Sequence, residues 1–426
     1  MTTSLLDRFP WLLSLYPKSS VFLAAALVYL GLVRSLRWRR YNAIHKKYSA
    51  KFRANSLTPE EAQEIMQLSF LWDMPTLGEY SLAFALFKTY AIPTISKLLL
   101  DTKQLASQPL VAKRYGDTEI LIATWMACPL AGRLVTANPG DPIDDPRASI
   151  ALARVNWLHS RYKISNDDYL YTLGLFAFEP QAWAAQYGWR ALSPLERQAT
   201  NIIQGAFIYW SEVGRKMNIK NIPATEEEYR AWLQNYEEEH MVPAQTNHDV
   251  ANYTTEELLF MVPKALRPFF QTLTHSMLED RVRIAMMQPK APGYAKYIID
   301  ATMGLFACVE RYLLLPRRKP FAICQVDMPK IHAGQPAPLL HPTKYPSKPW
   351  YKPRGRGLGG YLLDRFLVVV GFHDDIPRPE YRCEGYRIQE VGPLRYEKEG
   401  HEQIMKMAEE IQGCPIGDAW KAKATS

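Results

Sequence analysis

Residues 147–162 read RASIALARVNWLHSRY, and this stretch sets the fold class predicted for the whole chain. Apolar residues recur in it at steps of three and four, which is the spacing of one face of an α-helix. Ala151, Val155 and Leu158 fall on that face together with His159. The pattern therefore predicts a helix whose histidine points into the protein.

A buried imidazole restricts what His159 can do. It must hydrogen-bond a neighbour, bind a metal or haem iron, or remain unsatisfied at a free-energy cost of about 2 kcal/mol or more. Buried polar groups usually find partners, so spacing alone favours a hydrogen-bonded core histidine. The alternative, a ligand of iron, needs support from other residues.

The composition is that of a large folded protein. The chain has 426 residues, of which 47% are hydrophobic and 22% charged, and this excludes a disordered chain. Its five cysteines form no CxxC pair, which favours reduced thiols in a cytosolic compartment over a disulfide framework. The net charge of +8 is concentrated near the N-terminus and around residues 344–356. This distribution favours an anionic membrane surface over nucleic acid as the partner.

The N-terminal region has the pattern of a membrane anchor. Residues 19–33 read SSVFLAAALVYLGLV, and six Lys and Arg follow between Arg34 and Lys47. An apolar run this short suits a thin bilayer such as that of the endoplasmic reticulum (ER). No small-residue cleavage site of a signal peptide follows it.

The basic cluster also predicts an orientation, because such clusters stay on the cytosolic side. We expect lumenal residues 1–18, one transmembrane helix at 19–37 and a basic juxtamembrane segment at 38–57. The rest of the chain would then lie in the cytosol.

Helix signals fill the middle of the chain. Thr58–Glu61 and Thr225–Glu228 have the spacing of capping boxes, Ser165 is placed to cap a helix, and Thr255 is expected to open another. No run alternates apolar and polar residues long enough to suggest a sheet. The chain is therefore predicted to be mainly α, with a helical core at 58–315.

The remaining residues, 316–426, are predicted to be an irregular, Pro-rich segment and C-terminal helices packed on the core. Many of the prolines fall between Pro316 and Pro353. Residues 360–372, GYLLDRFLVVVGF, are too few and too charged to span a bilayer. We expect a buried helix there, with an interfacial helix lying on the bilayer as the alternative.

Two motifs match known cofactor sites only in part. The sequence GRGLGG at 355–360 fits GxGxxG but follows no expected strand, so we interpret it as a flexible linker. The stretch Arg382–Gly385 lacks the Phe and Gly that precede the thiolate of a cytochrome P450. Cys383 is therefore interpreted as structural.

Histidines and carboxylates at two places in the sequence are candidates for a metal site. His373-Asp374-Asp375, with His401, could supply part of a facial triad for non-haem iron, and the alternative is a solvated turn. Glu237–His240 and His248-Asp249 are typical of an exposed acidic helix end. No GxSxG, HExxH or Walker A sequence occurs.

A second pair of residues adds to the argument for His159. Arg114 and Thr118 are four residues apart, so they lie on the same face of a helix. A guanidinium beside a hydroxyl can hold oxygen or an oxyanion.

With these residues the chain resembles the fungal ER-bound oxygenases typified by the mycophenolic acid B enzyme, distant relatives of the latex-clearing rubber oxygenases. The resemblance extends over most of the chain, from the N-terminal anchor with its basic flank onward. The stretches that carry it are Phe87–Ser96, Lys113–Tyr115 with Asp117–Thr118, Arg154 with Leu158–Ser160, Leu170–Leu173, Met241–Pro243, Glu279–Arg283 and Gly385–Gln389.

The latex-clearing branch implies a globin-like helical core that binds haem b. By this resemblance His159 would be the axial ligand of the haem iron, and Arg114 and Thr118 would lie on the oxygen side. That branch also has a glutamate base before the arginine. Here the corresponding stretch, Ser96–Gln104, offers only Asp101.

The activity that the resemblance implies is that of an ER-membrane oxygenase of secondary metabolism. Its substrate would be a lipophilic, prenylated intermediate, with O2 as co-substrate and cleavage of an isoprenoid C=C bond to carbonyl products. One alternative is a haem-free or non-haem-iron oxidation of such a substrate. The other is a non-catalytic, membrane-tethered binding protein.

Overall fold

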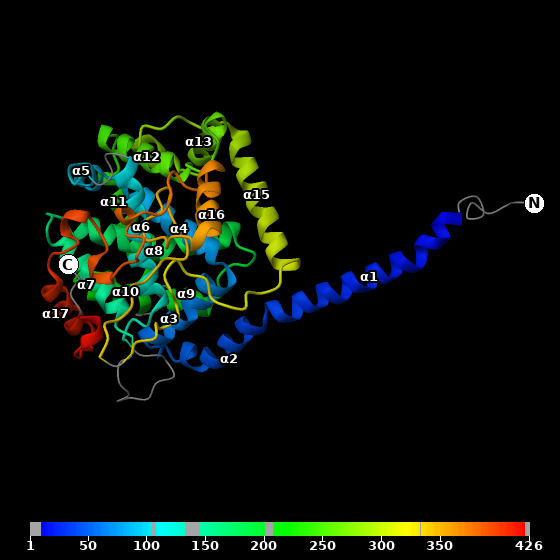
Figure 1. Cartoon of the computed structure of the whole chain (residues 1–426), viewed down its shortest axis with the longest axis horizontal. Coiled ribbons are helices and arrows are strands. Elements are labelled where there is room, and N and C mark those ends of the chain that lie inside the picture. The colour runs from blue at the N-terminus through cyan, green and yellow to red at the C-terminus, as the bar shows by residue number, and fades with distance from the viewer. Residues whose placement is uncertain (1–9, 104–107, 133–144, 201–207, 333, 422–426) are drawn as a thin grey trace, which may run out of the picture.

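The chain folds into helices joined by loops and by one long irregular segment (Figure 1). The computed structural model describes residues 10–103, 108–132, 145–200, 208–332 and 334–421. These residues contain no strand, and their isolated β-bridge joins Leu340 to Tyr386. The prediction of a mainly α protein is confirmed.

The elements follow one another in a simple order. The helices are α1 (Pro10–Arg37), α2 (Arg39–Arg53), α3 (Pro59–Gln67), α4 (Pro75–Thr89), α5 (Pro93–Asp101), α6 (Gln108–Ala127), α7 (Arg147–His159), α8 (Asn166–Tyr187), α9 (Pro194–Thr200), α10 (Ile208–Lys216), α11 (Glu226–His240), α12 (Gln245–Leu258), α13 (Arg267–Ser276), α14 (Asp280–Ala285), α15 (Gly293–Tyr312), α16 (Gly357–Val369) and α17 (His401–Gln412). A π-helical turn, Leu68–Asp73, joins α3 to α4.

Helix α1 extends away from the globular part of the chain (Figure 1). Its apolar side chains are exposed, for example Phe22 at 75% and Val28 at 72%. Among the described residues, the N-terminal helix is long and apolar enough to cross a membrane. Helices α4 and α5 are long and apolar enough to cross a membrane only when they are taken together, and the pair is bent by 95°. The expected span at 19–37 falls within α1, whereas residues 1–9 lie outside the described residues.

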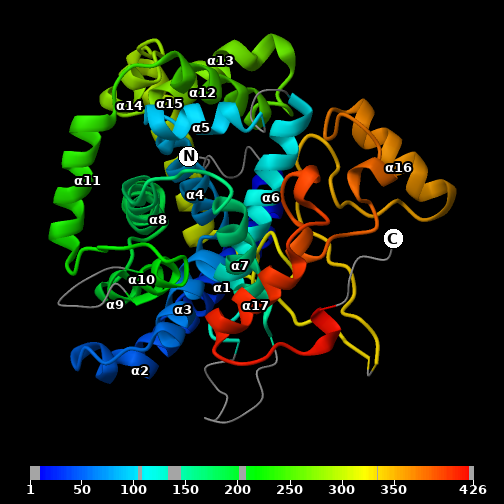
Figure 2. The ribbon, with the colours of Figure 1, turned by 90° about the vertical axis from the view of Figure 1, so that its left-hand side faces the viewer.

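Helix α7 is buried on every side. It packs between α6 and α17 (Figure 2), and every residue from Arg147 to Val155 is buried. The sequence predicted that only one apolar face of this helix would be buried. In the structure the other faces, which carry polar residues, are buried as well. Gly400, before α17, has a φ of 73° and a Cβ there would lie 2.1 Å from the Trp157 ring. Only glycine allows this close approach of α17 to α7.

Arg147, at the start of α7, holds the beginning of the irregular segment. Its guanidinium pairs with Asp145 at 2.7 Å. It also donates hydrogen bonds to the carbonyl oxygens of Gln325 at 2.6 Å and Val326 at 2.8 Å. The planar guanidinium fork satisfies several backbone acceptors that would otherwise be buried without partners.

Arg154, two turns later, holds the end of the same segment. It is fully buried and donates to the carbonyl oxygens of Val391 at 2.8 Å and Tyr396 at 2.9 Å. Lys113 of α6 reaches the neighbouring Gly392 carbonyl at 2.7 Å. The C-terminal segment therefore forms part of the wall around α7.

Most of the predicted helix starts are confirmed. Thr58 and Thr225 both form complete capping boxes, and the Ser165 hydroxyl accepts a hydrogen bond from the Asp168 N–H. The prediction for Thr255 is wrong, because this residue lies near the end of α12. There Thr255 donates to the Ala251 carbonyl at 2.8 Å, so the hydroxyl is used inside a helix.

Two further predictions are wrong in the region of α16. Its apolar side chains are exposed, with Leu358 at 75% and Val369 at 83%, so the expected buried helix is wrong. The glycine run that opens α16 is also no flexible linker. Gly355 donates its N–H to Asp364 at 3.0 Å, and its Cα faces the backbone of Gly360 so closely that a Cβ would lie 2.3 Å from that backbone.

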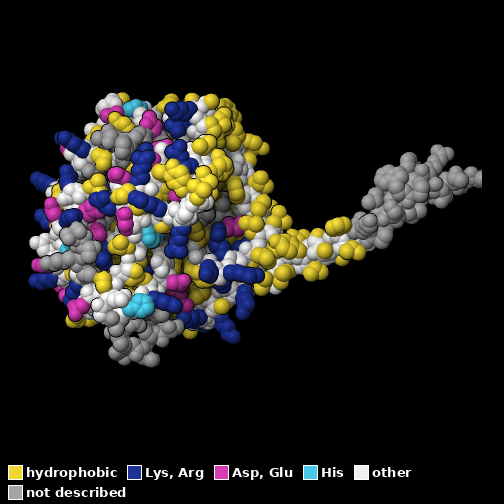
Figure 3. Space-filling view, in the orientation of Figure 1, with side chains coloured by type: hydrophobic (Ala, Val, Ile, Leu, Met, Phe, Trp, Pro, Cys, Tyr) yellow, Lys and Arg dark blue, Asp and Glu magenta, His cyan; other side chains and the backbone are white. Residues whose placement is uncertain are grey.

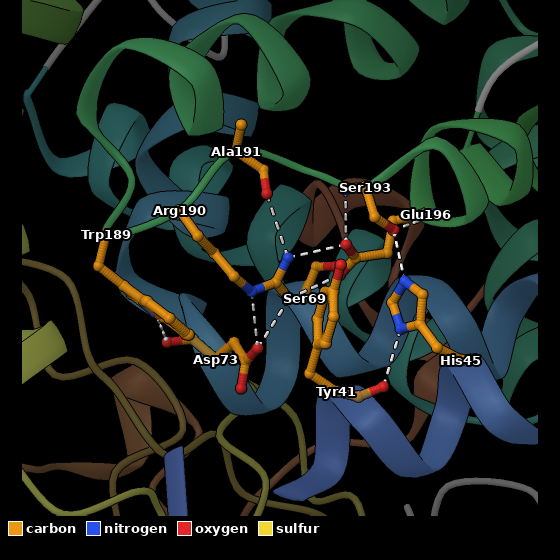
Figure 4. A network of polar contacts seen from close by, with 9 residues as sticks. All are labelled: Tyr41, His45, Ser69, Asp73, Trp189, Arg190, Ala191, Ser193 and Glu196. Carbon is orange, nitrogen blue, oxygen red and sulfur yellow. Dashed lines mark hydrogen bonds and ion pairs between the residues drawn. The ribbon is translucent and has the colours of Figure 1, made fainter. Parts of the chain in front are cut away.

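A network of buried charges attaches the juxtamembrane helix α2 to the core (Figure 4). The Arg190 guanidinium lies 2.7 Å from Asp73 and 2.6 Å from Glu196. His45 of α2 contacts the Tyr41 carbonyl at 2.8 Å and the Ser193 hydroxyl at 2.7 Å. A carbonyl only accepts, so Nδ1 of His45 carries the proton and Nε2 accepts from Ser193.

Replacing Arg154 by alanine should destabilise the fold. Arg154→Ala leaves the carbonyl of the buried Val391 without its donor and removes one of the two donors to the Tyr396 carbonyl, the other being the Glu399 N–H. We therefore expect the free energy of unfolding to fall by about 2–4 kcal/mol. Thermal and denaturant unfolding of the detergent-solubilised chain measures this change. Arg161→Ala, an exposed arginine just past the end of α7, is the control and should change stability by less than about 1 kcal/mol. Equal losses in the two variants would contradict the role assigned to Arg154.

Candidate functional site

An apolar cavity of about 320 Å³ lies within the helical part of the protein. Helices α4, α5, α6, α7, α8, α10 and α12 contribute its walls, together with Phe70 and Leu71 of the π-helical turn. This volume is typical of small-molecule sites, which hold about 300–1,000 Å³. Arg114, Thr118 and His159 all line it. The structure thus brings together the three residues that the sequence predicted, from two helices.

Helix α6 presents its polar residues as three consecutive pairs, each spaced by four residues. Lys113 and Asp117 are 2.8 Å apart and face away from the cavity, toward Tyr351 and the C-terminal segment. The next two pairs, Arg114 with Thr118 and Tyr115 with Glu119, line the cavity. About two turns of α6 therefore supply both the contacts to the C-terminal segment and the polar groups of the cavity.

Arg114 and Thr118 contact each other directly. The Arg114 Nη1 donates to the Thr118 Oγ1 at 2.5 Å, and that hydroxyl donates to the Arg114 carbonyl at 2.7 Å. The remaining guanidinium N–H groups of Arg114 make no hydrogen bond within the described part of the chain. They are free to bind a ligand oxygen in the cavity.

His159 ends α7 at the cavity wall. Its Nδ1 is inaccessible and has no hydrogen-bond partner among the described residues. Burial, and then the positive charge of Arg114, lower the pKa of the imidazole to about 4. The ring is therefore neutral at physiological pH, which is the form that binds metals. The hydrogen-bonded core histidine expected from spacing alone is not what the structure shows at Nδ1.

Glu119 is a cavity residue that the sequence interpretation missed. Its Oε1 is buried and has no partner among the described residues. Burial raises the pKa of this carboxyl to about 7, while Lys344 and the Tyr115 hydroxyl act in the opposite direction. A carboxyl that titrates near neutral pH can both take up and release a proton. The signal in the sequence was its spacing of four from Tyr115, directly beside the Arg114 and Thr118 pair.

The other candidate residues do not reach the cavity. Asp101 is exposed at the end of α5. His373 contacts the Pro346 carbonyl, and His401 contacts the Glu397 carbonyl. The described residues contain no group of three His, Cys, Asp or Glu placed to hold a metal ion. The facial triad considered from the sequence is therefore not assembled.

Glu237 also differs from its expected place at an exposed helix end. It lies 3.9 Å from the Lys88 Nζ, which is buried and pairs with Glu179 at 2.8 Å. Tyr171 donates to Glu237 at 3.1 Å. These contacts tie α4, α8 and α11 together, so this carboxylate has a structural role.

The residues at the cavity are compatible with an iron-containing cofactor such as haem, which the resemblance implies. A neutral imidazole with an orphaned ring nitrogen is an available ligand. The walls beside it are apolar, including Val155, Leu158 and Phe176. Because Nδ1 is inaccessible, a metal would bind through the other ring nitrogen, Nε2, for which no hydrogen bond is found within the described residues.

Fold and site together define a helical protein with an N-terminal helix long and apolar enough to cross a membrane and with a cavity lined by a histidine. Comparison with protein families finds no match for this chain. Individual proteins are similar, however. The chain is 31% identical over 409 residues to the ER-bound oxygenase mpaB' of Penicillium brevicompactum, covering 89% of both chains.

Two further relatives carry the same description. The chain is 35% identical over 279 residues to the ER-bound oxygenase mpaB of Penicillium roqueforti (strain FM164), covering 61% of this chain and 87% of that one. It is 33% identical over 296 residues to the mpaB of Penicillium brevicompactum, covering 64% and 70%. The chain belongs to the mpaB family of fungal ER-bound oxygenases.

Glu119 should make stability depend on pH. Between pH 4.5 and about 7 the folded carboxyl keeps a proton that the unfolded chain releases. Stability should therefore fall as pH rises through this window, by up to about 3 kcal/mol, and Glu119→Gln should not show this loss. The measurement is unfolding of both proteins from pH 4.5 to 8.

A matched substitution separates this effect from the general loss of a carboxyl. Glu239→Gln removes an exposed carboxylate and should leave the pH dependence of the wild type unchanged. Parallel pH profiles for wild type and Glu119→Gln would show that Glu119 titrates normally.

Proposed function

We propose that this member of the mpaB family is an oxygenase that cleaves an isoprenoid C=C bond of a lipophilic, prenylated intermediate of secondary metabolism. O2 is the oxidant, and haem b is held by His159. The observation that carries the proposal is the meeting of His159, Arg114 and Thr118 at one apolar cavity. The names of the relatives supply the reaction class. Haem and a globin-like helical core are what the resemblance to the latex-clearing oxygenases implies.

Each residue has a distinct task in this proposal. His159 binds the iron through a neutral imidazole, since its pKa of about 4 keeps it unprotonated. Haem iron, when bound, supplies the centre at which O2 is activated. Arg114 donates hydrogen bonds to the oxygen that develops negative charge, and the Thr118 hydroxyl fixes the guanidinium in place. The apolar walls receive the prenyl chain and exclude water.

The reaction balances without a further reductant. The C=C bond breaks, and each of its carbons receives one atom of O2 to give two carbonyl groups. Glu119 lies on the same wall with a pKa of about 7, so it can hold or release a proton beside the reacting oxygen.

The proposed location is the ER membrane with the N-terminus in the lumen and the catalytic part in the cytosol. The ER-bound relatives and the apolar helix α1 support the membrane. The basic residues of α2 support the orientation, because positive segments remain cytosolic. A membrane location also suits the substrate, since each buried methylene contributes about 0.8 kcal/mol to partitioning into the bilayer.

Two alternatives remain distinct from this proposal. One is oxidation of the same kind of substrate without haem, and the other is a membrane-tethered protein that binds the substrate without reaction. An absorption spectrum with pyridine haemochrome analysis separates haem-dependent from haem-free chemistry. Turnover of a prenylated phenol under O2 separates catalysis from binding.

Oxygen-18 gas tests the reaction. Both carbonyl products of a prenylated substrate should carry one labelled atom each, because both atoms of one O2 are inserted. Borohydride should be present during turnover, so that aldehydes become alcohols before they exchange with water. A parallel reaction in labelled water under ordinary O2 is the control. Label from water alone would refute an oxygenase.

Variants of the three cavity residues test their roles. His159→Ala should lose the Soret band together with activity, because no second histidine lines the cavity among the residues that the structure describes. Arg114→Ala and Thr118→Ala should retain haem and lose about 10²-fold in kcat, the scale for removing a preorganised contact to a reacting oxygen. Arg114→Lys should recover little, since a point charge cannot replace the guanidinium fork.

His248→Ala is the matched control. This histidine is half-buried and contacts the Met286 carbonyl at 3.2 Å, outside the cavity. The control should keep both haem and specific activity. A folded His159→Ala protein with full specific activity would refute the ligand assignment.

A further inference from the structure

Apolar side chains gather on the side of the globular part from which α1 extends. Figure 3 shows hydrophobic side chains gathered over α15 and α16 and continuing onto α1, while charged side chains predominate on the other half. Tyr297 and Phe306 of α15 are 74% and 67% exposed. Leu358, Leu362 and Val369 of α16 are exposed to a similar degree. Soluble monomers seldom expose apolar patches this continuous without a partner.

Helix α15 is fixed to the anchor. It packs against α1, and the Tyr29 hydroxyl of α1 donates to the Leu313 carbonyl at 2.7 Å. One turn past the anchor, Arg40 donates to the Arg317 carbonyl at 2.7 Å. Because α15 runs across the direction of α1 (Figure 1), a bilayer crossed by α1 would meet α15 along its length.

Helix α16 is attached by its polar side. Asp364, the buried residue of this helix, pairs with Lys352 at 2.6 Å and accepts the Gly355 N–H. Its leucine, phenylalanine and valine side chains are thereby left facing outward. Figure 2 shows α16 protruding at the edge of the globular part. This arrangement is that of an interfacial helix, with a polar attachment and an apolar outer face.

Basic residues border this surface. Arg317, Arg318 and Lys319 are exposed and follow directly after the exposed Leu313–Leu315. Arg365 of α16 is exposed as well. Such cations are attracted to the anionic headgroups of a cytosolic leaflet. Apolar side chains flanked by cations match the two layers of a lipid surface, acyl chains and anionic headgroups.

We infer that α15, α16 and the turn at Leu313–Leu315 form a bilayer-facing surface, which docks the catalytic part onto the cytosolic leaflet beside its own anchor. The inference rests on the proposed membrane anchoring. It adds a second membrane contact, which fixes how the cavity is presented to lipid.

The cavity reaches the protein surface next to this region. Leu258, the last residue of α12, lines the cavity and is 40% exposed. From there the chain continues through the exposed Met261 into α13, which packs against α15. In the proposed docking, a lipophilic substrate dissolved in the bilayer would therefore approach the cavity wall beside α12.

Fluorescence quenching by lipids tests the surface in the full-length chain. Cys308 of α15 is exposed and Cys414 is partly exposed, whereas the other three cysteines are buried. In Cys414→Ser protein, Cys308 is labelled with an environment-sensitive fluorophore and the protein is reconstituted into phosphatidylcholine vesicles with phosphatidylserine. Lipids that carry a nitroxide in the upper acyl chain should quench the label at least about twofold, as for a group about 5–10 Å deep.

Two further labels provide a second site and a control. Leu362→Cys on α16, in a Cys308→Ser and Cys414→Ser background, should be quenched to a similar extent. Helix α17 lies on the side of the globular part away from α1 (Figure 1), and its Lys406 is exposed. A label on Lys406→Cys should therefore not be quenched. Phe306→Glu, at an exposed position, should reduce quenching of the α16 label at least about twofold, because a carboxylate opposes burial in lipid.

Carbonate extraction of the same vesicles separates docking from anchoring. Protein that resists extraction but has an unquenched Cys308 label is anchored without docking, and this overturns the inference alone. Protein that is extracted but was quenched beforehand docks without a spanning anchor, which supports the inference and overturns the anchor. Protein that is extracted and unquenched overturns both. Energy transfer between Cys308 labels on two protein molecules, without quenching by lipid, would instead mean that this surface forms a dimer interface, and it would overturn the inference.

Discussion

Two buried guanidinium groups, those of Arg147 and Arg154, need hydrogen-bond acceptors inside the protein, and this need constrains the rest of the structure. Arg147 and Arg154 lie on α7, a helix that is buried on every side, so neither can reach water. Each solves this by donating to backbone carbonyls of the irregular segment that follows residue 315. The same bonds satisfy carbonyls that no helix or strand pairs. The loops on both sides of α16 can thus serve as a wall of the core.

This constraint also positions the site. With α7 enclosed by α6, α17 and the C-terminal segment, its last residue, His159, is held at the cavity wall. Lys113 reinforces the arrangement from α6, since it pairs with Asp117 and reaches the Gly392 carbonyl. The residues one step along α6, Arg114 and Tyr115, then face the cavity. Structural and functional groups share one helix because successive residues point in directions about 100° apart.

The sequence predicted those features that depend on local spacing. The caps at Thr58, Ser165 and Thr225 and the common face of Arg114 and Thr118 follow from helix geometry alone. The missed features depend on which element covers which. An apolar run such as that of α16 looks the same whether it packs in a core or faces lipid. Thr255 followed by two glutamates has a helix-start pattern, yet tertiary contacts extend α12 through it.

The pKa of Glu119 likewise depends on tertiary packing that the local sequence does not reveal. A glutamate beside a threonine on a helix gives no sign that it is buried, and its carboxyl titrates near neutral pH only because the cavity removes it from water. The pair formed by Glu79 and Lys344, which joins α4 to the irregular segment, lies near enough to modulate that pKa. The distant segment thus influences the site electrostatically as well as by packing. The cavity polarity therefore depends on contacts between residues more than two hundred positions apart. The hydrogen bonds of Arg147 and Arg154 to the chain beyond residue 315 hold that part of the chain against α7.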